Sequence, residues 1–255
     1  MPRLYVRTRL TLLTSAWLAL AVIGAAHGRG PVRGEVPVAI KGARPEPGYE
    51  IRQIAGWTVY VNEKLLTDQK DATTRALELL NSQLETIANV IPEGPLAQIR
   101  GVPLWLNPEY PGVRPRAEYH PAVGWLRANH RNPAMAKCVE VTNVRILEQE
   151  IKRMPVFILH ELAHAYHDRV LGFGHQGIQA AYARAVESKS YEAVKRHNGT
   201  IDRAYALTNA QEYFAENTEA FFGRNDFYPF DRADLKKHDP DMEALIAKVW
   251  KVKPR

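Results

Sequence analysis

The sequence contains a single cysteine, Cys138, which excludes any disulfide bond within the chain. Cys138 lies in the apolar alternating stretch KCVEVTN, and a lone cysteine in such a setting is typical of a small buried residue rather than a catalytic thiol. Internal repeats and low-complexity tracts are also lacking. The 45% apolar and 24% charged residues are ordinary globular proportions, which argues against wholesale disorder.

Long uncharged hydrophobic runs are confined to residues 10–26, LTLLTSAWLALAVIGAA, which follow Arg3, Arg7 and Arg9. A basic start, an apolar run and small residues at its end predict a secretory signal peptide over residues 1–26. The protein is therefore expected to be secreted or periplasmic. An uncleaved membrane anchor is the alternative, because the run approaches the lower length limit for a membrane span.

A strong positive charge is lacking once the predicted signal peptide is removed. The whole chain has a formal charge of +6, and cleavage after Ala26 removes three arginines and no acid, leaving +3. A charge of this size does not imply a polyanionic partner, so nucleic-acid binding is not expected. Membrane contact is expected only through an uncleaved signal, and the oligomeric state stays open.

Length and local composition predict one folded domain after a linker. Residues 27–50 are rich in glycine, proline and arginine and show no hydrophobic period, which is typical of a flexible linker. The remaining residues, 51–255, are enough for a single domain with its own core.

Hydrophobic periodicity places strands mostly before helices along this domain. The predicted strands, which alternate apolar and polar residues, cover residues 57–62, 99–107 and 136–143. The predicted helices, with apolar residues at three- and four-residue spacing, cover residues 71–91, 144–153, 155–171, 176–188, 209–223 and 241–251. Pro103 favours an edge position for the second strand, and residues 108–134 are expected to be loop. The predicted fold class is α+β, a small mixed β-sheet packed against a predominantly helical half.

The segment FILHELAHAYHD, residues 157–168, carries three histidines and a glutamate on an apolar predicted helix. His160 and His164 lie one turn apart on one helical face, about 6 Å apart at Cβ, and their imidazoles can bind one zinc ion at about 2.0–2.1 Å. Glu161 lies about 100° round the helix, where it can take a proton from a zinc-activated water and pass it to a leaving amine. The H-E-x-x-H pattern therefore predicts a catalytic site with one Zn2+ per chain, rather than core or surface histidines.

A third protein ligand is required, because catalytic zinc sites usually have three protein ligands and a water. A metzincin would have glycine three residues and histidine six residues after His164, where this chain has His167 and Val170, so that class is excluded. His167 lies about 10 Å along the helix axis from His160 and is therefore expected beside the site or at the surface. The candidate third ligands are His167, His175, Glu212, Glu216 and Glu219.

The segment TNAQEYFAENTEAFFG, residues 208–223, is the preferred source of the third ligand. Glu212, Glu216 and Glu219 recur at spacings of four and three residues and form one acidic stripe on a predicted helix. The helix is rich in aromatic residues and is expected to be buried, and buried carboxylates need a cation or hydrogen-bond donors. We expect this helix to face the first one, with Asn209 as its N-cap.

HELAHAYHD and the later run Y-x-x-x-N-x-x-E-Y-F-A-E, which starts at Tyr205, resemble the catalytic domain of the anthrax lethal factor-type zinc metallopeptidases, a gluzincin family. The resemblance covers roughly residues 155–223 and does not extend to the delivery and docking domains of the toxin. It implies a zincin-like fold with Glu161 as general base and Tyr205 pointing at the site. The implied zinc ligands are His160, His164 and Glu212.

The neighbouring residues have expected roles as well. The phenol hydroxyl of Tyr205 can donate a hydrogen bond to the oxyanion of a tetrahedral intermediate. Glu216, one turn after Glu212, can hydrogen-bond a ligand imidazole and fix its tautomer, and it is the fallback third ligand.

The leading functional hypothesis is an exported zinc-dependent metallopeptidase, most simply an endopeptidase, acting on a protein or peptide substrate. Such a peptide is expected to add as a strand to the sheet edge near Cys138 and Val141. Two alternatives stay open. One is a zinc amidase acting on cell-wall or other non-protein amides, and the other is a non-catalytic binding module on a degenerate peptidase scaffold. The intact Glu161 argues against the binding module.

Overall fold

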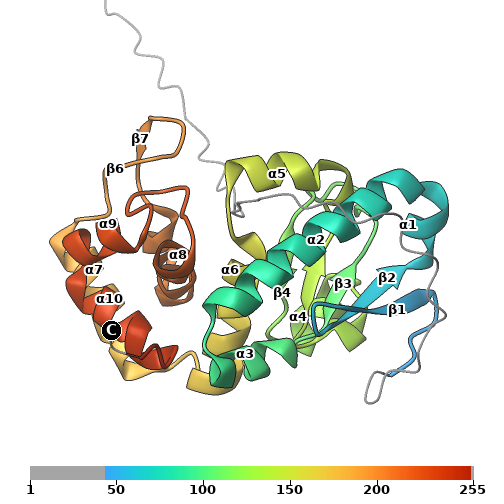
Figure 1. Cartoon of the computed structure of the whole chain (residues 1–255), viewed down its shortest axis with the longest axis horizontal. Coiled ribbons are helices and arrows are strands. Elements are labelled where there is room, and N and C mark those ends of the chain that lie inside the picture. Colours follow the sequence, from blue (N-terminus) through green and yellow to red (C-terminus); the bar gives the residue numbers. More distant parts are fainter. Residues whose placement is uncertain (1–43, 254–255) are drawn as a thin grey trace, which may run out of the picture.

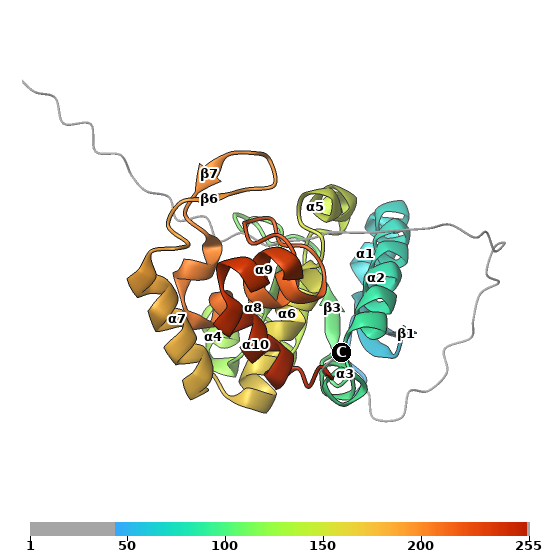
Figure 2. The same cartoon turned by 60° about the vertical axis from the view of Figure 1, so that its left-hand side comes forward.

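The computed structural model describes residues 44–253, so the predicted signal peptide and most of the predicted linker lie outside the described residues. A five-stranded sheet and the first helices form one side of the molecule, and the last helices form the other (Figure 1). Helix α6 (Phe157–Tyr166) lies between the two groups (Figures 1 and 2). The predicted α+β class, a small mixed sheet with a larger helical part, is confirmed.

The sheet has the strand order β1-β2-β3-β5-β4, with antiparallel pairs at both ends and parallel pairs in the middle. Its strands are β1 (Tyr49–Ile54), β2 (Trp57–Asn62), β3 (Leu104–Leu106), β4 (Ala117–Tyr119) and β5 (Val139–Val141). Successive side chains alternate between the two faces of the sheet. Val59, Leu104 and Val139 belong to the main core, whereas Tyr60 and Trp105 belong to a smaller core of their own.

The remaining elements are mostly helical. The helices other than α6 are α1 (Glu63–Asp68), α2 (Lys70–Val90), α3 (Glu93–Arg100), α4 (Val123–Ala128), α5 (Leu147–Arg153), α7 (Gln176–Ser188), α8 (Ala210–Phe222), α9 (Arg232–His238) and α10 (Pro240–Val249). A short hairpin of β6 (Val194–Lys195) and β7 (Ile201–Asp202) projects from the helical side (Figure 1). Among the described residues, no helix combines the length and apolar character needed to cross a membrane.

Helix α6 is the central helix of the molecule because it is apolar nearly all round. All of its residues are buried except His164, which is partly exposed. The helix continues into a π-helical turn, η3 (His167–Leu171), and ends at Gly172, whose φ of +78° favours glycine. At the other end, a Cβ on Gly223 would lie 2.7 Å from Cγ1 of Val156, so glycine allows the end of α8 to approach the start of α6 closely.

Predicted elements with a long periodic pattern are confirmed. The strand 57–62 is β2, the helix 176–188 is α7, and the helix 71–91 is α2 shifted by one residue. Asn209 caps the start of α8, as predicted, and Gly223, where the predicted helix ends, is its C-cap.

The prediction was wrong in several short elements. The predicted strand 99–107 is only the three-residue strand β3, because its first two residues belong to the end of helix α3. Strand β3 is an interior strand of the sheet rather than an edge strand. The third predicted strand, β5, is interior as well. Residues 108–134, expected to be loop, contain the true edge strand β4 and helix α4. The predicted linker also ends earlier than expected, since β1 starts at Tyr49, and helix α9 was not predicted. Strands of three residues are too short to give an alternation signal.

Candidate metal centre

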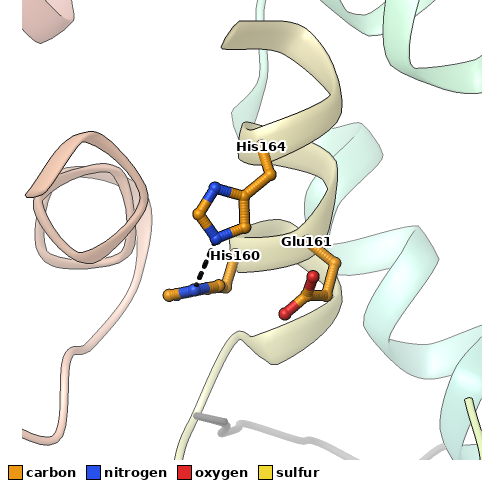
Figure 3. A group of neighbouring side chains, drawn as sticks. All are labelled: His160, Glu161 and His164. Atoms are coloured by element: carbon orange, nitrogen blue, oxygen red, sulfur yellow. Dashed lines mark hydrogen bonds between the residues drawn. The ribbon is translucent and has the colours of Figure 1, made fainter. Parts of the chain in front are cut away.

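Helices α6 and α8 bring two imidazoles and one carboxylate to a single point. Figure 3 shows the rings of His160 and His164 meeting one turn apart on α6, with the Glu161 side chain beside them. The Nε2 atoms of His160 and His164 are 3.1 Å apart. Oε2 of Glu212, from α8, lies 3.1 Å from Nε2 of His160 and 3.3 Å from Nε2 of His164. The predicted ligands therefore form a triangle of three possible donor atoms.

The size of this triangle fits a tetrahedral zinc ion. Ligand atoms at the usual zinc distances of about 2.0–2.1 Å are about 3.3 Å from one another in a tetrahedron. The three separations between the ligand atoms of His160, His164 and Glu212 are 3.1, 3.1 and 3.3 Å. Two imidazoles and one carboxylate also match the ligand types of catalytic zinc sites, which keep a fourth position open.

The electrostatics of the triangle favour a cation. Burial alone would lower the pKa of His160, but hydrogen bonds to Glu212 and Glu219 raise this pKa well above its usual range. Burial opposes ionisation of Glu212, yet the neighbouring His164 and His160 hold the pKa of this carboxyl far below its usual range. The site therefore holds a negative carboxylate and attracts a positive charge, which a metal ion would supply in place of a proton.

Glu219, rather than Glu216, fixes the ring of His160. Oε1 of Glu219 lies 2.6 Å from Nδ1 of His160, whereas the nearest Glu216 oxygen is 3.9 Å away. The prediction that Glu216 makes this bond was wrong. Seven residues nearly complete two helical turns, so Glu219 lies almost directly along the axis from Glu212, whereas Glu216 is rotated by about 40°. A hydrogen bond at Nδ1 leaves Nε2 for a metal, which is the usual arrangement around a ligand histidine.

Burial raises the pKa of both glutamates on this side of the centre. The pKa of Glu219 rises to about 7, although the hydrogen bond to His160 opposes the shift. The pKa of Glu216 is raised well above its usual range by burial and by the nearby carboxylates of Glu219 and Asp226. Glu216 is therefore a buried neighbour of the centre, and it makes no hydrogen bond to either imidazole.

Glu161 lies beside the triangle and is held by the sheet. One carboxylate oxygen of Glu161 is within 4.8 Å of a ring nitrogen of each of His160 and His164. Its Oε2 atom accepts a hydrogen bond of 2.6 Å from the main-chain N–H of Tyr119 in β4. Burial raises the pKa of Glu161, while the two histidines and the Tyr119 N–H act in the opposite direction.

Tyr205 and Asn209 lie at the start of the helix that carries Glu212. The side-chain oxygen of Asn209 accepts a hydrogen bond of 2.8 Å from the Glu212 main-chain N–H and thereby fixes the first turn of α8. Tyr205 is half-buried in the 3-10 turn η4 (Tyr205–Thr208). Burial and the charges of Glu212, Glu216 and Glu161 raise its pKa, so the phenol keeps its proton next to these carboxylates.

The other histidines proposed as ligands do not reach the centre. His167 is fully buried between Phe173 and Phe214, with ring centroids 5.1 and 5.0 Å away. Among the described residues neither of its ring nitrogens has a hydrogen-bond partner, and burial lowers its pKa to about 4. His167 is therefore buried rather than at the surface. His175 is the N-cap of α7.

A second polar cluster lies around the fully buried Glu140 of β5. Its oxygens accept hydrogen bonds from Asn107 at 2.6 Å, Tyr110 at 2.7 Å, and His120 and Arg131 at 2.9 Å each. These four donors occupy both oxygens of Glu140. Although Glu118, His120 and Glu140 lie close together, the Glu140 carboxylate therefore has no free oxygen for a metal ion. The signal of this cluster in the sequence is a charged residue, Glu140, in the middle of an apolar strand.

Comparison with known proteins finds no relative. No family model matches the chain, and neither the curated proteins nor the solved structures contain a match.

Proposed function

We propose that the protein is a zinc-dependent metallopeptidase with a zincin-like catalytic domain. The observation that carries this proposal is the triangle of His160, His164 and Glu212, whose separations of 3.1–3.3 Å match a tetrahedral zinc site. The resemblance of the two helices to anthrax lethal factor-type peptidases supports the same ligand set. The predicted signal peptide supports export to the periplasm or the outside of the cell.

A zinc ion bound there would supply Lewis acidity and would lower the pKa of a water molecule. Glu161 is close enough to the two imidazoles to accept the proton of that water and to return it to the departing amine. The protonated phenol of Tyr205 would donate to the oxyanion of the tetrahedral intermediate. Glu219 would keep His160 in the tautomer that leaves its Nε2 lone pair for the ion.

The resemblance favours a peptide over a non-protein amide as substrate. Strand β4 is the edge of the sheet next to α6, and its residue Tyr119 contacts Glu161. The main-chain groups that face outward from β4 belong to Ala117 and Tyr119, which are 0% and 7% exposed, so this edge is covered in the structure. The edge expected near Cys138 and Val141 is interior, because β5 is paired on both sides.

Metal analysis of the purified protein, paired with hydrolysis of unfolded casein, tests the proposal. We expect about one zinc per chain in both the wild type and Glu161→Gln. Hydrolysis should fall by about 100-fold or more in the variant, because the general base is lost. A wild type that binds no zinc would overturn the proposal. Zinc without hydrolysis of any protein or peptide would favour the amidase or the binding module.

A further inference from the structure

The register of β4 decides which of its main-chain groups point away from the sheet. Thr142 N–H donates to the carbonyl of Arg116, and His120 N–H donates to the carbonyl of Cys138. In an antiparallel pair, main-chain groups alternate between the partner strand and the opposite side. The N–H groups of Ala117 and Tyr119 therefore point away from β5, and both residues are buried.

These two edge groups differ in what they contact. The Tyr119 N–H donates a hydrogen bond of 2.6 Å to Oε2 of Glu161, whose side chain is almost completely buried. A hydrogen bond from an N–H to a charged carboxylate is among the stronger ones in proteins. The Tyr119 N–H is thus already used within the protein.

Tyr119 is itself fixed at several points. Its phenol hydroxyl donates a hydrogen bond of 2.7 Å to Oδ2 of Asp168. Asp168 lies in the turn η3, which continues the helix α6 that carries Glu161. The next residue, His120, is tied to β5 through its main-chain N–H and through its ring, which lies 2.9 Å from Oε2 of Glu140. The donor that faces Glu161 is therefore held in place before any substrate arrives.

We propose that the main-chain N–H of Tyr119 is a positioning group for the catalytic glutamate. It binds one oxygen of Glu161 and so sets the direction of the carboxylate relative to His160 and His164. This inference rests on the proposed peptidase function. It adds that the edge strand orients the base of the reaction.

Proline substitution tests the role in catalysis, because proline lacks an N–H and is tolerated on edge strands. The zinc-loaded variants Tyr119→Pro and Tyr119→Ala both lose the phenol, but only the alanine variant keeps the N–H. We expect kcat of Tyr119→Pro to be about 10- to 100-fold below that of Tyr119→Ala. Ala117→Pro, which removes the other N–H on this side of the strand, is expected to lower kcat less than Tyr119→Pro does. Equal kcat values for Tyr119→Pro and Tyr119→Ala would overturn the proposal.

Amide hydrogen exchange tests the contact without any activity measurement. In the zinc-free 15N-labelled protein, we expect the Tyr119 amide to exchange at least about tenfold faster in Glu161→Ala than in the wild type. Glu161→Gln keeps an acceptor oxygen and should retain most of the protection, and the Ala117 amide should respond to neither variant. Unchanged exchange at Tyr119 in Glu161→Ala would overturn the inference. Absence of hydrolysis by the zinc-loaded wild type would instead count against the peptidase function, and it leaves the exchange test valid.

Discussion

His160 and Glu219 are joined by a hydrogen bond of 2.6 Å between Nδ1 and Oε1, which links α6 to α8 behind the proposed zinc ligands. Removing the charge with Glu219→Gln should weaken zinc binding by about 10- to 100-fold, because the carboxylate orients the imidazole and raises its basicity. Competition with a chelator of known affinity measures the change. Glu216→Gln is the matched control and should have the smaller effect, since Glu216 is 3.9 Å from the same nitrogen. A larger loss for Glu216→Gln would contradict this assignment.

His167 makes the stability of the zinc-free protein depend on pH. Its pKa is about 4 in the folded state, below the unfolded value of about 6.5, so the unfolded state binds the proton first as pH falls. Stability is therefore lost between about pH 6.5 and 4, by about 2 kcal/mol at pH 5. His167→Leu should remove this part of the pH dependence, and it breaks no hydrogen bond because neither ring nitrogen of His167 makes one within the described part of the chain. Urea unfolding at pH 7 and pH 5 measures it, and an unchanged difference between the two pH values would refute the assignment.

Gly223→Ala should destabilise the protein by about 1–3 kcal/mol, because the added methyl group would overlap Val156 at the contact between α8 and α6. Thermal or urea unfolding gives the value. Gly174→Ala is the control, since nothing lies within 4 Å of its added Cβ. The loss in free energy of unfolding caused by Gly223→Ala should be smaller in a Val156→Ala background. An unchanged loss would show that another contact is responsible.

Glu140→Leu should destabilise the protein by about 3–5 kcal/mol, because it leaves the buried Arg131 without its counter-charge. Glu118→Leu removes the cross-strand neighbour, which pairs with the partly exposed Arg116, and should cost about 1 kcal/mol or less. Urea unfolding of the two variants compares them. Similar losses would mean that the cluster around Glu140 contributes no more than an ordinary ion pair.

The sequence predicts the helical part of the candidate site better than the sheet part. His160 and His164 are recognisable because a fixed spacing of four residues places two side chains on one helical face. The acidic stripe on α8 was also visible, but spacing alone does not decide which of Glu216 and Glu219 reaches His160. That choice depends on how the axes of α6 and α8 cross, and their crossing depends on packing contacts such as the one at Gly223.

The contact between Tyr119 and Glu161 has no signal in the sequence. Every residue except proline carries a main-chain N–H, so the donor is invisible until the register of β4 is known. The strand has only three residues and lies in a segment with several prolines, which favoured the interpretation as loop. Glu140 itself stands out as a charge in an apolar strand, but its partners do not, because the donors come from four places in the chain.

The β6–β7 hairpin lies in the chain between the two helices that carry the proposed zinc ligands, and residues 197–203 are all exposed. A single proteolytic cut in this turn would leave both imidazoles on the N-terminal fragment and the Glu212 carboxylate on the C-terminal one. Neither fragment alone would contain all three proposed ligands. Retention of the proposed zinc ion by nicked protein would then report directly on whether the two pieces remain associated.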